Sequence, residues 1–161
     1  MGKVKIEVFT FAVIILFGCL GLAADKSASD RSFKAELSGN EEVPPVETEA
    51  KGKATFQFSQ KGDQLTYMLS ISQIKDVTAT YICAGRKGEN GALVVELFSE
   101  PKKEDVSGTL LAEGKIEPYL LFGPLLGGSV RSLVQLIESG SAYINILTKK
   151  YPLGEIRGQI K

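Results

Sequence analysis

The chain has 161 residues, with 19 Lys and Arg against 19 Asp and Glu, a formal net charge of +0 and no histidine. Because acidic and basic residues are balanced and interspersed, the sequence offers no basic surface for nucleic acid. The lack of histidine removes the general base of Ser-His-Asp and Cys-His catalytic sets, which excludes a hydrolase of the usual acyl-transfer type.

The N-terminus has the pattern of an export signal. Two lysines precede an apolar run from residue 8 to residue 22, and the chain turns polar at Asp25. This run is shorter than the ~20 residues that a membrane-spanning helix needs, and no basic stop-transfer cluster follows it. We therefore expect residues 1–24 to be a signal peptide that is removed on export.

Two outcomes of signal processing are open, because Cys19 ends a Leu-Phe-Gly-Cys stretch similar to the acylation box of bacterial lipoproteins. Phe17 fits that box poorly, so we favour an ordinary cut near Ala23 or Ala24. Acylation of Cys19 is the alternative, and it would tether the protein to the membrane. The predicted location is periplasmic, secreted or lipid-anchored at the cell envelope, with membrane contact only through the signal segment or this anchor.

The mature chain is predicted to begin with a linker and then to fold as one domain. Residues 25–32 have no periodic apolar face, which is typical of a solvated linker. From Phe33 onward apolar residues alternate with polar ones, the pattern of a half-buried strand. The remaining residues, 33–161, have a length that suits a single domain.

A Pro-Pro break separates this first strand from two further alternating rows. Pro44 and Pro45 cannot donate ladder hydrogen bonds, so residues 41–46 are predicted to be an edge or a crossover and not a central strand. Residues 54–58 and 65–71 alternate apolar and polar side chains on either side of a turn at 61–63, which predicts a hairpin.

The middle of the sequence contains Cys83, the one cysteine outside the signal segment. A lone cysteine excludes an intramolecular disulfide in the mature protein. We interpret Cys83 as a small buried side chain on a strand over 78–83, the alternative being a reactive or metal-binding thiol. The loop over 85–91 contains Asn90-Gly91, a pair that favours a tight turn, and it lacks the ending of a phosphate-binding loop. A strand over 93–98 follows.

One helix is predicted in the second half of the chain. After a broken strand pattern over 106–116, an apolar run over 119–126 either covers the core, which we favour, or docks a partner. Apolar residues at 130, 133, 134 and 137 have helical spacing, with Ser129 as a candidate N-cap and Gly140 as a C-terminal stop. They predict a short helix near residues 129–139.

The last two strands are predicted over 142–147 and 154–160. We expect the guanidinium of Arg157 to pair with Glu155, Glu41 or Glu42. The amide of Asn145 is expected to hydrogen-bond to the backbone of residues 149–154. Many short strands, regular turn signals and a single helix predict an all-β protein, an antiparallel β-sandwich or flattened Greek-key barrel of immunoglobulin-like or superoxide-dismutase-like type.

Four stretches of the sequence resemble the CHRD domain, namely residues 42–46 (EVPPV), 79–85 (ATYICAG), 89–91 (ENG) and 143–160 (YINILTKKYPLGEIRGQI). This module is repeated in chordin and stands alone in many exported bacterial and archaeal proteins, and the resemblance covers residues 33–161. Members of the family usually carry His-x-His where this chain has Tyr81 and Cys83, and His-Thr where it has Leu147 followed by a threonine. The resemblance implies a ligand cluster in such relatives and an apolar or weakly polar cluster of Tyr81, Cys83 and Leu147 in this chain. The other motif positions, structural or binding, are Asn145, Glu155 and Arg157.

The leading functional hypothesis is a non-catalytic, exported module that binds an unidentified protein or envelope component, with no cofactor, metal or catalytic residue. One alternative is a metal-binding or redox protein that uses Cys83. A further alternative is a hydrolase with two carboxylates, although nothing in the spacing of the available residues favours it. Those residues are Asp76, Glu89, Glu96 and Glu100.

Overall fold

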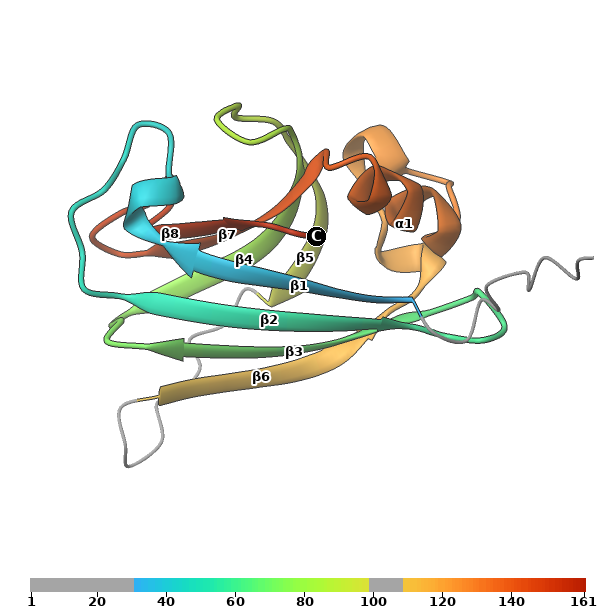
Figure 1. Ribbon diagram of the computed structural model, residues 1–161, viewed down its shortest axis with the longest axis horizontal. Coiled ribbons are helices and arrows are strands. Elements are labelled where there is room, and N and C mark those ends of the chain that lie inside the picture. Colours follow the sequence, from blue (N-terminus) through green and yellow to red (C-terminus); the bar gives the residue numbers. More distant parts are fainter. Residues whose placement is uncertain (1–30, 99–108) are drawn as a thin grey trace, which may run out of the picture.

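A single antiparallel sheet of eight strands runs through residues 31–98 and 109–161, the parts of the chain that the computed structural model describes. The elements are β1 (Ser32–Ser38), β2 (Lys51–Phe58), β3 (Leu65–Ser72), β4 (Val77–Ala84), β5 (Ala92–Phe98), β6 (Thr109–Ile116), α1 (Val130–Glu138), β7 (Ala142–Thr148) and β8 (Ile156–Gln159). The order across the sheet is β5-β4-β7-β8-β1-β2-β3-β6, and the sheet curls into a nearly closed barrel (Figure 1). The prediction of an all-β fold with one short helix is confirmed.

Several of the predictions concern residues that lie outside the described ranges. Residues 1–30 contain the predicted signal peptide with Cys19 and most of the predicted linker, and Glu100 of the carboxylate alternative lies in the second gap. The last two linker positions are described, and β1 already begins at Ser32. In the described ranges, no helix has the length and apolar character needed to cross a membrane.

The alternation of side chains in β1, β2 and β3 creates the first half of the barrel core. In β2 every second residue is buried, from the exposed Lys51 to the buried Phe58. The register places Phe56 between Phe33 of β1 and Tyr67 of β3, so aromatic rings of three strands meet on the inner face. Burial of large rings is a main source of folding free energy. The predicted hairpin around residues 61–63 is confirmed.

Two crossings of the barrel give the fold its Greek-key character. β3 leads to β4, which pairs with β5 and β7, and β5 leads to β6, which pairs with β3 at the opposite edge. β7 lies between β4 and β8. Connections that return to lie beside an earlier strand define the Greek key. Residues 42–50 form no strand, which agrees with the prediction that residues 41–46 are not a central strand.

The edge strands β5 and β6 share no ladder in the described part of the chain, and a loop covers one end of the seam between them. Val95 of β5 forms an isolated bridge with Leu121, and the N–H of Phe122 donates to the carbonyl of Val94 at 3.0 Å. The segment after β6 thus supplies backbone hydrogen bonds to the exposed edge of β5, which limits pairing with other chains there.

Tyr67 also crosses the seam. Its hydroxyl on β3 donates a hydrogen bond to the carbonyl of Leu97 on β5 at 3.0 Å. The ring lies against Gly114 of β6, where a Cβ would come within 2.8 Å of it. The glycine therefore makes room for the ring that joins the two edges of the sheet.

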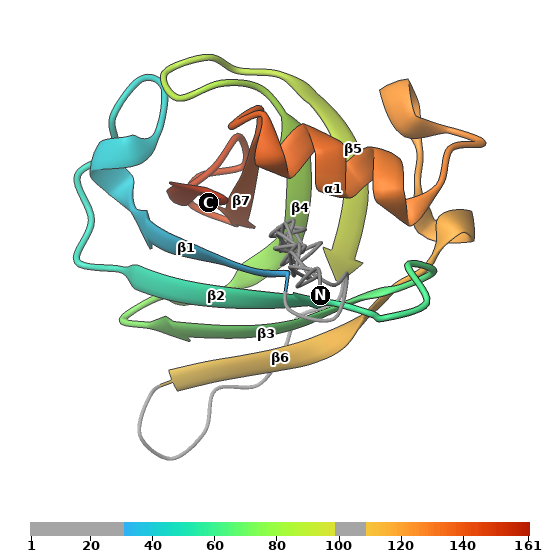
Figure 2. The ribbon, with the colours of Figure 1, turned by 45° about the vertical axis from the view of Figure 1, so that its right-hand side comes forward.

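The helix α1 lies across one open end of the barrel (Figure 2). Ser129 accepts a hydrogen bond from the N–H of Ser132 at 3.4 Å, and Gly140 follows the helix with a φ of +68°. Its buried face consists of Val130, Leu133, Val134 and Ile137. These are the four predicted apolar positions, and both predicted end signals are confirmed.

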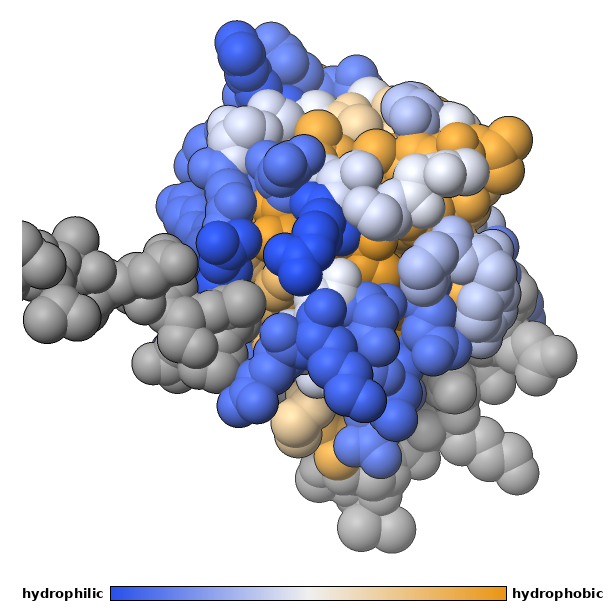
Figure 3. Space-filling model, turned by 90° about the vertical axis from the view of Figure 1, so that its right-hand side faces the viewer, coloured by the Kyte–Doolittle hydropathy of each residue, from blue (hydrophilic) through white to orange (hydrophobic). Residues whose placement is uncertain are grey.

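The apolar run over 119–126 is partly buried and partly exposed. Leu121 is buried and Leu125 packs against the core, which confirms the favoured prediction that the run covers the core. Tyr119 and Leu126, however, are each 77% exposed. Figure 3 views the molecule from the α1 end and shows hydrophobic surface gathered toward one side of it.

The seam generates a first prediction. Tyr67→Phe should lower the free energy of unfolding by about 1 kcal/mol, because it removes one buried hydrogen bond and leaves the carbonyl of Leu97 without this donor. Urea denaturation measures the change. Tyr119→Phe, at an exposed site, is the matched control and should change stability by less than about 0.5 kcal/mol. Equal effects of the two substitutions would contradict a role for Tyr67 in closing the seam.

Candidate functional site

The motif residues lie on the face of β4, β7 and β8 that points away from the core. Ile144 and Ile146 belong to the core, so the residues between and beside them on β7 point outward. The register sets Asn145 of β7 between Tyr81 of β4 and Arg157 of β8. Three strands thus bring distant parts of the sequence together on one outer face.

Tyr81, Cys83 and Leu147 share this outer face. Cys83 lies opposite Tyr143, on one side of the Tyr81–Asn145 pair. Leu147 lies on the other side of that pair, two residues along β7 from Asn145. The polar Asn145 side chain therefore stands inside the cluster. The cluster is more polar than the three predicted members alone would make it.

Arg157 is the buried charge of this face, with 2% of its surface exposed. Its guanidinium donates to the carbonyls of Arg86 at 3.0 Å and Glu89 at 2.8 Å, and to Oδ1 of Asn90 at 3.2 Å. It also stacks on the ring of Tyr143, 3.4 Å from the centroid. The planar guanidinium suits both contacts, since its edge carries the donors and its face is attracted to an aromatic ring. Arg157 therefore holds the 85–91 loop over the sheet.

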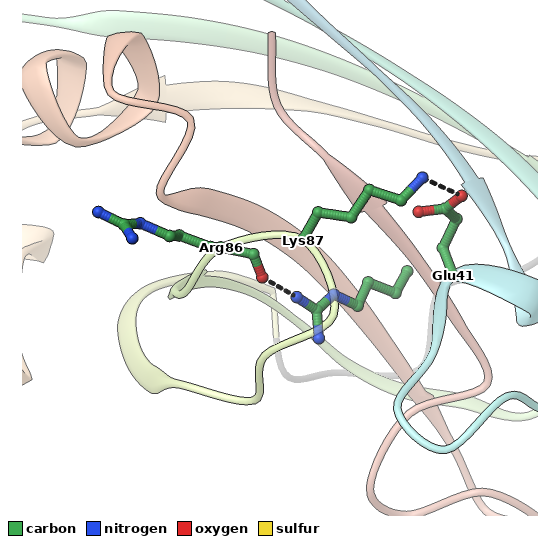
Figure 4. Close-up of polar contacts among 4 residues, drawn as sticks. Glu41, Arg86 and Lys87 are labelled. Carbon is green, nitrogen blue, oxygen red and sulfur yellow. Dashed lines mark hydrogen bonds and ion pairs between the residues drawn. The ribbon is translucent and has the colours of Figure 1, made fainter.

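The prediction that Arg157 forks onto a carboxylate is wrong. Within the described residues it forms no ion pair, and Glu41 pairs with Lys87 at 2.9 Å instead. Figure 4 shows the side chains of Glu41 and Lys87 pointing toward each other. Nearby, the carbonyl of Arg86 accepts a hydrogen bond from the guanidinium of Arg157. Glu42 attracts Arg157 electrostatically from a greater distance. Backbone carbonyls, which no side-chain pattern marks, fill the acceptor positions.

Glu155 has a separate structural role. Its carboxylate accepts hydrogen bonds from the hydroxyls of Thr48 and Thr148, both at 2.7 Å. These bonds tie the segment before β2 to the end of β7 and the start of β8. Since both carboxylate oxygens have donors, Glu155 is satisfied by these contacts and not by Arg157.

The turn of the 85–91 loop is at Gly88, which has a φ of +83°, and not at Asn90-Gly91 as predicted. The N–H of Glu89 closes the turn on the carbonyl of Arg86 at 3.0 Å. The Asn90 side chain accepts from the guanidinium and donates from Nδ2 to the carbonyl of Val43 at 2.8 Å. Asn90 thus serves as a bridge between loops, a tertiary role that a local turn signal cannot reveal.

A cavity of about 490 Å³ opens beside this face, between residues 42–46, residues 90–93 and residues 150–154. Cys83, Tyr143 and Asn145 are among its lining residues. Its lining also includes Leu153, which is 89% exposed, Leu93, which is 41% exposed, and the exposed Lys150. The size and the mixture of apolar and polar groups are typical of a small-ligand site.

A second hollow, of about 560 Å³, lies on the outer face of β2, β3 and β6. Exposed Met68 and Leu111 line it, and none of its lining residues is both polar and buried. Its polar lining residues are therefore all in contact with water. The cavity beside Asn145 is the candidate site.

Burial changes the protonation of two groups in this cavity. It raises the pKa of Glu42 from its ordinary value of 4.5 to about 7, although the attraction of Arg157 acts in the opposite direction. It also raises the pKa of Cys83 to about 11, so the thiol stays protonated at neutral pH. Cys83 is 1% exposed, which confirms the interpretation of a small buried side chain. A protonated, buried thiol is a poor nucleophile and a poor metal ligand.

Two acceptor atoms in the cavity have no hydrogen-bond partner. Asn145 donates from Nδ2 to the carbonyl of Leu153 at 3.0 Å, in the loop where we expected its partner. Its Oδ1, like Oε1 of Glu42, is buried without a partner, and these are two of the four such atoms in the described residues. Buried polar atoms are nearly always paired, so each exception suggests something that is missing, such as water or a ligand.

Glu42 is the site residue that sequence reasoning missed, since it entered only as a candidate partner of Arg157. The EVPPV motif marked its position but not its burial, which depends on loops far away in the sequence. Across the described ranges, no three side chains among Cys, Asp, Glu and His gather as a metal site would require. The chemistry that the cavity offers is hydrogen bonding, apolar contact and one titratable carboxyl group.

A second prediction concerns Arg157. Arg157→Ala should lower the free energy of unfolding by about 3 kcal/mol, because it leaves buried loop acceptors without their charged donor. Thermal and urea denaturation measure the loss. Arg86→Ala is the control, because its exposed side chain belongs to the same loop, and it should cost less than about 0.5 kcal/mol. An unchanged melting temperature for Arg157→Ala would contradict the structural role.

Comparison with known proteins gives one match. The family model of the CHRD domain matches residues 33–160, nearly the whole of the predicted domain. A search of the curated proteins and a search of the solved structures each found no match. The matched range contains seven of the eight strands in full, all of β1 but Ser32, α1 and the candidate site. The chain therefore belongs to the CHRD domain family, as its motifs indicated.

Proposed function

We propose that this CHRD domain is a non-catalytic, exported binding module whose ligand site is the cavity between residues 42–46, 90–93 and 150–154. The observation that carries the proposal is the pair of buried, unpartnered oxygen atoms that line this cavity. A bound ligand would supply partners for these two acceptors and cover the exposed apolar side chains beside them.

The inventory of reactive groups supports binding over catalysis. The sequence contains no histidine, so no imidazole is available as a general base. The thiol of Cys83 is buried and protonated, which gives no support to the redox alternative. Glu89 and Glu96 are exposed and lie outside the cavity lining, which gives no support to a hydrolase.

The partner that fits this proposal is a protein or envelope component that presents an apolar group. Leu153 and Leu93 stand exposed at the mouth, where contact with such a group would remove them from water. Hydrogen bonds to the cavity interior would then fix its orientation.

A third prediction tests the cavity as the binding site. In a screen of small apolar molecules against the ¹⁵N-labelled mature protein, binders should shift the NMR signals of Gly91, Leu153 and Gly154. Leu153→Ser should weaken such binders about fivefold, since it removes about 1 kcal/mol of apolar contact. Leu126→Ser is the matched control, because Leu126 is also an exposed leucine but lies outside the cavity. Binders that shift only the signals around Met68 and Leu111 would overturn the assignment.

Export is a separate part of the proposal, supported by the signal-like N-terminus. The intact mass of the protein purified from its native host should correspond to a chain that begins near Asp25. A mass that corresponds to a chain beginning at an acylated Cys19 would instead establish the lipid-anchored form. A mass that includes residue 1 would contradict signal cleavage.

A further inference from the structure

The cavity contains two buried oxygen atoms that have no hydrogen-bond donor. Oε1 of Glu42 and Oδ1 of Asn145 are both acceptors, and both are buried without a partner. The amide of Asn145 cannot turn to relieve the deficit, because Nδ2 already donates to the carbonyl of Leu153 at 3.0 Å. When Glu42 is ionised, what is missing at this place is therefore a donor, because only the protonated carboxyl carries its own O–H.

The two oxygen atoms converge on one point beside Gly154. A Cβ placed on Gly154 would collide with both the Glu42 carboxyl and the Asn145 amide. Both oxygen atoms therefore lie close to the backbone of Gly154 and close to each other, so a single group with several N–H bonds can bridge them. A group with one donor hydrogen, such as a hydroxyl, satisfies one of them and leaves the other.

The charges around Glu42 favour a cation as this donor. The titratable groups that face it are Arg157 of β8, Cys83 of β4, Tyr143 of β7, and Lys150 and Tyr151 of the 149–154 loop. Arg157 donates its hydrogen bonds to the 85–91 loop, and Nζ of Lys150 lies 4.8 Å from the ring centroid of Tyr151 at the exposed edge. Neither cation hydrogen-bonds to Glu42, so its carboxylate lacks a direct counter-charge in the described residues.

The apolar lining residues favour one kind of cation. Pro44, Leu93, Pro152 and Leu153 line the cavity and offer apolar contact to a ligand whose charged end meets the two oxygen atoms. An aliphatic stem would bury itself against them and leave its charged end at the acceptors, as amphipathic lysine side chains do elsewhere.

We propose that the cavity binds a primary ammonium group on an aliphatic stem, with the ammonium donating to Oε1 of Glu42 and Oδ1 of Asn145. The inference rests on the proposed function and names the ligand class of the same site. The third ammonium hydrogen remains for water or for a backbone carbonyl at the cavity wall. Binding then stabilises the ionised form of Glu42, so uptake of the ammonium releases a proton when the carboxyl is initially protonated.

Three probes of equal stem length test the inference on the wild-type protein, namely hexylammonium, hexanol and hexanoate. In ¹⁵N NMR titrations at pH 8, hexylammonium should shift the signals of Gly154 and of the Asn145 side-chain amide and bind at least tenfold more tightly than hexanol. Its affinity should fall about tenfold at pH 6, because Glu42 with a pKa of about 7 is then mostly protonated. Hexanol should show no such pH dependence, and hexanoate should bind most weakly.

Two variants test whether Glu42 recognises the ammonium group. Glu42→Gln should remove the preference for hexylammonium and its pH dependence, since the variant carries no charge and fills the deficit with its own N–H₂ group. Glu41→Gln is the matched control, because the adjacent Glu41 pairs with Lys87 outside the cavity, and it should bind as the wild type does. Separate titrations with N-acetyl-lysine methylamide and with phosphatidylethanolamine vesicles distinguish a lysine side chain from a lipid amine as the source.

The outcomes separate the two levels of inference. If hexanol shifts the cavity signals as strongly as hexylammonium, or if Glu42→Gln keeps the preference, the ammonium site is overturned while the cavity remains a binding site. If none of the probes shifts the cavity signals, both the ammonium site and the proposed binding function of this cavity are overturned.

Discussion

A guanidinium group removed from water must be surrounded by acceptors, and the way Arg157 meets this need determines the shape of the outer face. The carbonyls of Arg86 and Glu89 and the side chain of Asn90 turn toward it, which fixes the 85–91 loop over β8. Asn90 then reaches from the guanidinium to the carbonyl of Val43. One buried side chain therefore positions two segments that are far apart in the sequence and that together form two walls of the cavity.

The same arrangement leaves Glu42 without a direct ion pair to Arg157. In many proteins a buried arginine and a nearby glutamate form an ion pair, and each then satisfies the other. Here backbone dipoles solvate the cation, and its attraction to the carboxyl only partly offsets the effect of burial. The pKa of the carboxyl is thus raised to about 7, and its Oε1 has no hydrogen-bond partner in the described residues. A protein that needed Glu42 for stability alone would gain more from a direct contact.

The regular elements could be predicted from the sequence, because period and end signals act locally. The strand alternation around Phe56, the helix between Ser129 and Gly140 and the break at Pro44 follow from side-chain geometry and backbone constraints within a few residues. The candidate site could be predicted only in part. Asn145 and Arg157 were identified, but the partners of Arg157 are carbonyl groups that every residue possesses. Asn90 has a strong local preference for a turn, and a tertiary contact overrides it. The burial of Glu42 results from the meeting of loops that are separated by about one hundred residues, for which local patterns give no signal.

The division between the two faces of β4 and β7 has a consequence for how this fold diversifies. Side chains that point inward are held by dense packing, where a change of one methylene is felt by the neighbours. Tyr81, Cys83 and Leu147 all point the other way. Substitutions at these outer positions can therefore change the chemistry of this face without repacking the barrel.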